Sequence, residues 1–289
     1  MRVLITGASG QIGGALVRSV PPGIELHALT REQLDIGDAR AVHAAVAAFR
    51  PDLIINAAAY TAVDKAESEP FLADAINAQG PQHLAEAAYT QDGCRVIQIS
   101  TDYVFDGRGA EAYGPDDPPH PLSVYGRTKL AGEQAVLAAL GARAVVLRTA
   151  WVYAAQGRNF LLTMLRLMRE RGAVRVVADQ KGAPTAASSI ARALWRIAEL
   201  PRVRGILHWT DAGVTSWYEF ASAIAEDALA AGLLPQAAQV TPISTADYPT
   251  AAHRPANSVL DTRDSMLQLG IKPEHWRHNL RATLAQLRD

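Results

Sequence analysis

A tyrosine and a lysine one helical turn apart, Tyr125 and Lys129, are the residues of this chain best suited to acid–base chemistry. Side chains four residues apart on a helix project from the same face, so the phenol and the ammonium would lie together. A phenol has a pKa of about 10, and a nearby cation favours the phenolate, which eases proton transfer at neutral pH. The hydroxyl of Thr101 could hydrogen-bond a substrate carbonyl while that proton is transferred. The pair predicts a proton-transfer site, although a Tyr-x-x-x-Lys tetrad also arises by chance on amphipathic helices.

Short apolar runs alternate with helical patterns in the first half of the chain. The runs lie at residues 2–5, 24–28, 52–56, 95–100 and 144–148. Helical periodicity occupies residues 12–20, 38–49, 71–89 and 124–140. Continuous apolar runs are typical of strands buried on both faces, and their alternation with helices indicates βαβ units. We therefore predict an α/β fold with a doubly wound parallel sheet of the Rossmann type, whose ligand crevice lies at the carboxyl ends of the strands.

The pattern changes after residue 150. Helices are expected at 160–171, 188–200, 217–231 and 276–287. Runs at 174–177 and 206–209 would extend the sheet or form small strand pairs, and a loop-rich tail precedes the last helix. We expect residues 1–150 to form a NAD(P)-binding domain and residues 151–289 a smaller α/β lobe that binds substrate, with some later segments returning to the first domain.

Three glycines, Gly7, Gly10 and Gly13, separate the first expected strand from the first helix. Glycine permits a tight turn there, lets the backbone approach a pyrophosphate and allows close packing of helix on strand. The N–H groups at the helix start can then bind the phosphates, with Gln11 and Ile12 at that start. The spacing is Gly-x-x-Gly-x-x-Gly rather than the commoner Gly-x-Gly-x-x-Gly. Its position between strand and helix predicts a dinucleotide site.

Two further loops are expected to contact the cofactor. The second strand ends at Arg31 without an acidic residue for a ribose hydroxyl, so this arginine could face a 2′-phosphate and favour NADP over NAD, or be a solvated surface side chain. Asp35 could accept a hydrogen bond from the adenine amino group beside Ile36. After the third strand, the small-residue loop would let the backbone pass beneath the cofactor; its residues are Ala58, Ala59, Tyr60 and Thr61.

Composition excludes several other classes of protein. The 289 residues are 49% hydrophobic and carry a net charge of −1, without a basic cluster that would suggest nucleic acid or a membrane surface as partner. The single cysteine, Cys94, precedes an apolar run and cannot form an intramolecular disulfide. No Cys/His cluster has metal spacing, and no run has the roughly 18 apolar residues of a membrane helix. With an apolar strand beginning at Val3 in place of a signal peptide, we expect a cytoplasmic protein.

Taken together, these motifs resemble the extended short-chain dehydrogenase/reductases, and more narrowly the dTDP-4-dehydrorhamnose reductase family, over nearly the full length. The more specific blocks of this resemblance lie at residues 62–67, 124–133, 148–153, 159–160, 179–185 and 254–258. The resemblance implies NADP(H), possibly NAD(H), as cofactor and the reduction of the C4 ketone of dTDP-4-dehydro-L-rhamnose, the last step of dTDP-rhamnose synthesis, which feeds lipopolysaccharide and O-antigen. It also implies that Tyr125 donates the proton and that Lys129 binds the nicotinamide ribose and lowers the tyrosine pKa.

The resemblance also assigns substrate contacts. Thr101 would hydrogen-bond the sugar ketone, with Asp102 beside it, and Trp151 would pack against the substrate from the second lobe. Tyr103 and Asn159 are further expected substrate residues, while Arg254 would pair either with the substrate diphosphate or in an ordinary salt bridge.

Two departures refine this interpretation. Sugar-nucleotide 4,6-dehydratases carry Thr-Asp-Glu where this chain has Tyr103 as the third residue, so reduction fits and dehydration does not. Some members of the family form magnesium-bridged dimers through glutamates, but here Ala15 and Ser188 stand at those positions. We therefore expect no metal and a monomer or weak homodimer.

Two alternatives remain open from the sequence. One is an extended reductase or epimerase acting on a different nucleotide sugar. The other is a non-catalytic NADP-binding regulatory subunit resembling that of methionine adenosyltransferase.

Overall fold

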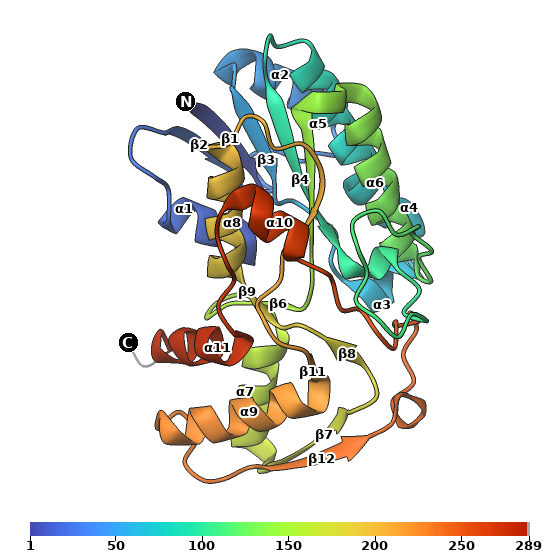
Figure 1. The fold of residues 1–289 in the computed structure, drawn as a ribbon, viewed down its shortest axis with the longest axis vertical. Helices are drawn as coiled ribbons and strands as arrows, with labels where there is room; N and C mark the ends of the chain where they lie inside the picture. The colour runs from blue at the N-terminus through green and yellow to red at the C-terminus, as the bar shows by residue number, and fades with distance from the viewer. Residues whose placement is uncertain (288–289) are drawn as a thin grey trace.

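The computed structural model describes residues 1–287 and places a six-stranded, fully parallel sheet at its centre (Figure 1). The strand order is β10-β5-β4-β3-β1-β2. Their bounds are β1 Arg2–Thr6, β2 Glu25–Leu29, β3 Leu53–Asn56, β4 Arg95–Thr101, β5 Ala144–Thr149 and β10 Gly205–His208. The predicted doubly wound fold is confirmed. The order reverses between β1 and β3, which is where such sheets open a ligand crevice.

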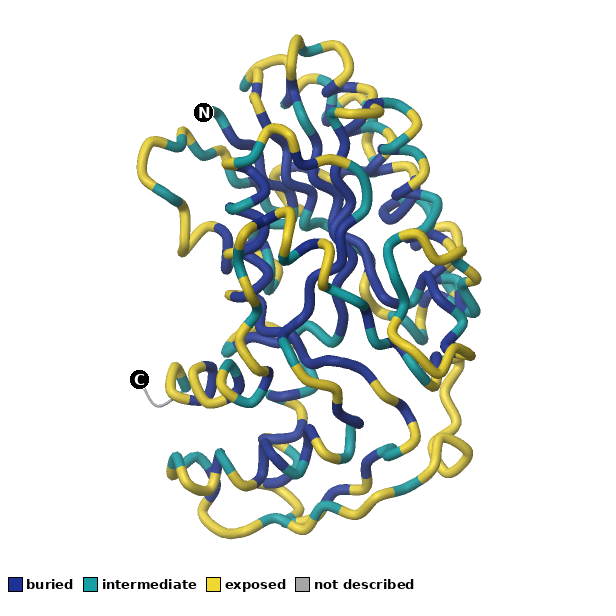
Figure 2. Tube along the Cα trace, in the orientation of Figure 1, coloured by how far each residue is buried: buried dark blue, intermediate teal, exposed yellow. Residues whose placement is uncertain are grey.

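Alternate side chains of the sheet enter two separate cores. On β1, Val3 and Ile5 face one core and Leu4 faces the other, and the three are fully buried. The first face is covered by α1 Gln11–Arg18, α8 Ala187–Ala198 and α10 Arg263–Leu269. The second face is covered by α2 Ala39–Phe49, α5 Gly80–Tyr89 and α6 Val124–Leu140. Figure 2 shows the buried residues gathered along the sheet between these layers.

The helix expected over residues 71–89 is interrupted. It consists of α4 Pro70–Asp74, a π-helical turn at Ala75–Gln79 and then α5. The wider turn holds the buried Asn77, whose side-chain amide accepts a hydrogen bond from the backbone N–H of Tyr60 (2.9 Å) and donates one to its carbonyl (3.0 Å). A buried backbone segment needs such partners, and a π turn inside an α-helix is frequent near functional sites. Here it fixes the loop that follows β3.

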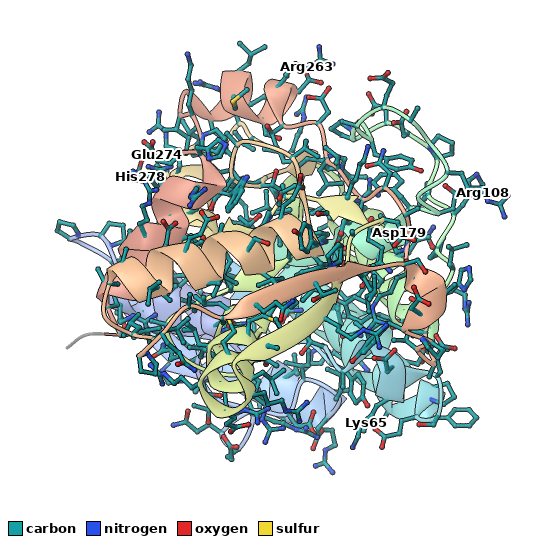
Figure 3. The ribbon with its side chains drawn as sticks, turned by 90° about the horizontal axis from the view of Figure 1, so that it is seen from below. Lys65, Arg108, Asp179, Arg263, Glu274 and His278 are labelled. Atoms are coloured by element: carbon teal, nitrogen blue, oxygen red, sulfur yellow. The ribbon has the colours of Figure 1, made fainter. Side chains whose placement is uncertain are left out.

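A second lobe lies below the carboxyl ends of the strands in Figure 1. Its helices are α7 Phe160–Arg171, α9 Trp217–Ala230 and α11 Trp276–Ala285. Short strand pairs join them: β6 Val152–Tyr153 with β9 Thr185–Ala186, β8 Lys181–Gly182 with β11 Thr215–Ser216, and β7 Ala173–Val177 with β12 Gln239–Ile243. Seen from below, α9 and the β7–β12 pair form its outer surface (Figure 3). The expectation of a loop-rich tail was wrong at residues 239–243, which pair in parallel with β7.

The chain passes between sheet and lobe more than once. After β5 it enters the lobe, returns through α8 and β10, enters the lobe again through α9 and β12, and comes back at α10.

No helix within residues 1–287 has both the length and the apolar character needed to cross a membrane.

Candidate active site

One cavity of about 1320 Å³ lies between the carboxyl ends of the strands and the second lobe. The glycine turn, the loop after β3 and the ends of β4 and β5 form one wall. The opposite wall comes from α7, β7, β12 and the first residue of α9. A cavity of this size has room for more than one small molecule, because ligand pockets are commonly about 300–1,000 Å³.

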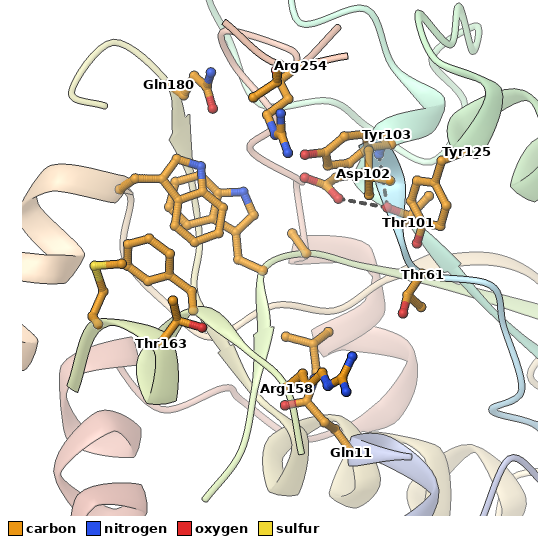
Figure 4. Close-up of a pocket in the computed structure, with 18 of the residues that line it drawn as sticks. Gln11, Thr61, Thr101, Asp102, Tyr103, Tyr125, Arg158, Thr163, Gln180 and Arg254 are labelled. Atoms are coloured by element: carbon orange, nitrogen blue, oxygen red, sulfur yellow. Dashed lines mark hydrogen bonds between the residues drawn. The ribbon is translucent and has the colours of Figure 1, made fainter. Parts of the chain in front are cut away.

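Two of the proposed acid–base residues, Thr101 and Tyr125, lie together in this cavity (Figure 4), and Lys129 lines the same cavity. Thr101 is the last residue of β4, while Tyr125 and Lys129 lie on the first two turns of α6. Ser123 begins α6 by accepting a hydrogen bond from the Gly126 N–H (3.1 Å). A Cβ at Gly126 would stand 2.2 Å from the carbonyl oxygen of Tyr103, so only glycine lets α6 approach this closely. Close packing therefore sets where the phenol lies relative to β4.

Burial dominates the protonation of both helix residues. It raises the pKa of Tyr125 to about 12, with Asp102 also raising it and a hydrogen bond with Thr101 lowering it. Burial lowers the pKa of Lys129 to about 8, and the ammonium donates a hydrogen bond to the Ile99 carbonyl (2.6 Å) rather than to the phenol. The expected lowering of the tyrosine pKa by Lys129 is thus not seen in this geometry. Tyr125 is instead held in its protonated form, which is the form a proton donor needs.

Several buried polar groups of residues 1–287 that line the same cavity as Tyr125 have atoms without a hydrogen-bond partner. Asp102 accepts a hydrogen bond from the Thr101 hydroxyl (2.9 Å) on one oxygen, and burial raises the pKa of this carboxyl to about 6. Within residues 1–287, the second Asp102 oxygen and the hydroxyls of Ser100 and Thr149 are buried without a hydrogen bond. All three residues line the cavity. Unpaired buried groups are costly, so this cluster is suited to a polar ligand that satisfies them.

The glycine turn forms a cradle that a dinucleotide would fit. Gly7 has φ +68°, and a Cβ at Gly13 would lie 2.1 Å from the Gly7 carbonyl oxygen, so larger residues cannot form this turn. The helix α1 begins at Gln11 without a side-chain cap, which leaves its first N–H groups to bind a ligand. Gly10, Gln11 and Ile12 line the cavity.

The loop after β3 contributes small residues and backbone. Ala58, Ala59 and Thr61 line the cavity. Tyr60 is turned away, because its phenol donates a hydrogen bond to Glu69 (2.5 Å) while Asn77 holds its backbone. The residue therefore supports this wall without presenting its ring.

The residues expected near the adenine lie outside the cavity wall. Ile36 is 2% exposed and packs in the second core, where its side chain closely approaches Gly80. Asp35 accepts a hydrogen bond from the Gly37 N–H (2.9 Å), and Arg31 is exposed just beyond β2.

Comparison with known proteins identifies the family. The sequence model described as RmlD substrate binding domain matches residues 1–289. A dTDP-4-dehydrorhamnose reductase of Aggregatibacter actinomycetemcomitans is 44% identical over 287 residues, covering 97% of both chains. The chain belongs to the dTDP-4-dehydrorhamnose reductase family.

Two further relatives of this reductase family bear on cofactor and substrate. A solved structure of the Bacillus anthracis dTDP-4-dehydrorhamnose reductase in complex with NADP has a TM-score of 0.91 and 36% identity over 99% of each chain. A probable dTDP-4,6-dihydroxy-2-methyloxan-3-one 4-ketoreductase of Streptomyces antibioticus is 42% identical over 285 residues, covering 97% of this chain and 94% of its own. High identity thus extends across more than one sugar.

In this family member, the lobe side of the cavity centres on an aromatic pair. Trp151, at φ +47°, stacks on Trp217 with ring centroids 3.5 Å apart and planes 6° from parallel. A Cβ at Gly182 would come within 2.5 Å of the Trp151 ring, so glycine is required there. Trp217 lines the cavity, a position that the sequence did not predict for it. The available signal was Ser216-x-x-Glu219, a capping box that places Trp217 at the start of α9.

Two other expected substrate residues have protein partners. Asn159 does not line the cavity; it caps α7 by accepting from the Leu162 N–H (3.0 Å), and its amide donates to the Gln11 side chain (2.9 Å). Arg254 lines the cavity and pairs with Asp64, at 2.8 Å and 3.2 Å between nitrogens and oxygens. Within residues 1–287, no group of three His, Cys, Asp or Glu residues is placed to hold a metal ion.

Proposed function

We propose that this protein reduces the C4 ketone of dTDP-4-dehydro-L-rhamnose to dTDP-L-rhamnose with NADPH. The observation that carries this proposal is the convergence of Thr101, Tyr125 and Lys129 with the glycine cradle in one cavity. A regulatory subunit would have no need of a buried, protonated phenol beside a strand-end hydroxyl. The intact set therefore favours an enzyme.

The protein residues supply positioning and a proton. When bound, the reduced nicotinamide supplies a hydride to C4. Tyr125 donates its phenol proton to the C4 oxygen as the carbon–oxygen double bond becomes a single bond. The Thr101 hydroxyl, whose proton bonds Asp102 in this structure, would turn to donate a hydrogen bond to the same oxygen. Because the pKa of Tyr125 is raised to about 12, the proton is present at neutral pH and still moves readily to an alkoxide, the stronger base. Lys129 binds the ribose hydroxyls.

The remaining sites divide between the two parts of the chain. Gly10, Gln11 and Ile12 would hold the pyrophosphate, Arg31 the 2′-phosphate and Asp35 the adenine. The lobe that begins near residue 151 would bind the dTDP-sugar, with Trp151 against the sugar nucleotide and Arg254 at its diphosphate. We place the enzyme in the cytoplasm as a monomer or weak homodimer, without nucleic acid or membrane partners.

The test is a direct assay of the purified protein. We expect consumption of NADPH on addition of dTDP-4-dehydro-L-rhamnose, with dTDP-L-rhamnose identified by NMR. Comparing kcat/KM with other dTDP-linked 4-keto sugars distinguishes the proposed substrate from that of the Streptomyces relative. NADPH binding without reduction of any such sugar would contradict the proposal and favour the regulatory-subunit alternative.

A further inference from the structure

A cation from the lobe lies at the glycine turn, where nothing in the motif analysis placed one. Arg158 lines the same cavity as Ser9, Gly10 and Gln11 although it is almost 150 residues away along the chain. Figure 4 shows its guanidinium beside Gln11 and turned into the pocket. The lobe therefore reaches the phosphate end of the cavity as well as the sugar end.

The backbone around Arg158 is fixed against α1 by its neighbours. Gly157, at φ +83°, passes so close that a Cβ there would lie 3.3 Å from Cγ of Gln11. On the other side, the Asn159 amide donates to the Gln11 side-chain oxygen (2.9 Å) while its own oxygen caps α7. Contacts on both sides hold the position of Arg158 relative to the first turn of α1.

The Arg158 side chain itself is exposed at the cavity. Within residues 1–287 it makes no hydrogen bond or ion pair. Of the other cations on the cavity wall, Lys129 bonds the Ile99 carbonyl and Arg254 pairs with Asp64, while Arg171 and Arg175 belong to α7 and β7. An unpaired guanidinium beside uncapped helical N–H groups is suited to an anion, because both stabilise the same negative charge.

We propose that Arg158 binds the pyrophosphate of the nicotinamide dinucleotide from the lobe side, opposite the N–H groups of α1. This inference rests on the proposed use of such a cofactor. Arg31 would read the 2′-phosphate, which only NADPH carries, whereas Arg158 would contact the group that NADPH and NADH share. Cofactor binding would then bridge the sheet and the lobe before the sugar nucleotide arrives.

The experiment measures dissociation constants of NADPH and NADH by nicotinamide fluorescence in the full chain. We expect R158Q to weaken both by the same factor, roughly tenfold, and R158K to restore most of the loss. The salt dependence of both affinities should become shallower in R158Q, because one charge contact is gone. R31Q should weaken NADPH alone. R202Q, an exposed arginine outside the cavity wall, is the matched control and should match the wild type.

Two binding results would overturn the assignment. One is unchanged affinity for both cofactors in R158Q, and the other is a loss confined to NADPH, which would move Arg158 to the 2′-phosphate. A lower thermal unfolding midpoint in R158Q than in R202Q would also overturn it, by assigning the loss to folding. Binding is measured without sugar, so this test can succeed or fail independently of the proposed reductase activity. If the wild type binds NADPH but reduces no sugar, the proposed reductase activity is contradicted, whereas the comparison of R158Q with the wild type still tests the role of Arg158.

Discussion

On the sheet side of the cavity, Thr101, Tyr125 and Lys129 are 5%, 9% and 3% exposed, whereas on the lobe side Tyr248 is 60% exposed and Arg175 is also at the surface. The first wall is built from strand ends and a helix that packs on them through Gly126. The second wall combines an aromatic stack with a segment held by polar contacts at the surface, among them Asp64 with Arg254 and Asp179 with Thr245.

The contrast separates two requirements of one reaction. Proton transfer depends on sub-ångström placement, which buried and close-packed elements provide. Binding a large sugar nucleotide requires a wall that can admit and release it, and contacts open to solvent rearrange at little cost. Substitutions on the sheet side should therefore act on turnover, and those on the lobe side on substrate affinity.

The largest effect is expected from Tyr125→Phe. Removing the phenol oxygen leaves the ring in place but deletes the proton donor, so kcat should fall by about three orders of magnitude. The NADPH dissociation constant should change little, which fluorescence titration can check. A variant with near-wild-type turnover would show that another group delivers the proton.

Asp102 provides a test of stability on the same wall. Burial raises the pKa of this carboxyl to about 6, above its unfolded value of about 3.9, so the folded state binds the proton more tightly. The stability that this adds is present below about pH 4 and is lost as the pH rises to about 6. Relative to Asp102→Asn, the wild type should lose on the order of 3 kcal/mol of unfolding free energy over that window. Urea melts at several pH values measure this, and parallel curves would contradict it.

On the lobe wall, Trp217→Ala should raise KM for the dTDP-sugar by roughly tenfold, because the Trp151 ring loses its stacking partner. Turnover at saturation should change much less. Trp217→Phe keeps an aromatic face and serves as the control. A fall in kcat without a rise in KM would contradict the assignment of substrate affinity to the lobe wall.

The smallest effect is expected from Asp64→Asn. Burial acts to raise the pKa of the Asp64 carboxyl. This pKa nevertheless lies below its usual value, because the carboxyl accepts hydrogen bonds from Arg254 and Ala252 and lies beside the Arg254 charge. That contribution to stability is present above the unfolded pKa and is lost as the pH falls through the folded one. Because the Asp64 side chain is 45% exposed, its loss should cost less than about 1 kcal/mol. Thermal melts check this, and a shift in KM of a few-fold in either direction would show that Arg254 exchanges partners when substrate binds.

The central strands were predictable because their burial leaves a strong pattern. The apolar runs at 52–56 and 144–148 correspond to β3 and β5, which are buried along their whole length. β12 was missed because it contains Pro242 and is mostly exposed or half-buried, so it has neither a continuous nor an alternating apolar pattern. The π-helical turn left no periodic signal either, since its cause is the long-range bond between Asn77 and the loop at Tyr60.

The site shows the same division. The sequence indicated that Thr101, Tyr125 and Lys129 lie together, because strand ends and the helix register fix them locally. It did not indicate the raised pKa of Tyr125, since burial depends on packing from distant segments. It also missed Trp217 and Arg158, whose positions depend on how the lobe folds back over the glycine turn.

The return of β10 to the main sheet determines which strand edge a truncated chain would expose. Residues 205–208 pair with β5 along four positions, so a fragment ending near residue 150 would expose the backbone edge of β5. An unprotected edge of this kind pairs readily with other chains, and we expect such a fragment to aggregate. Because the chain crosses between the lobe and the sheet several times, we expect the lobe to move against the sheet only by small hinge or sliding displacements.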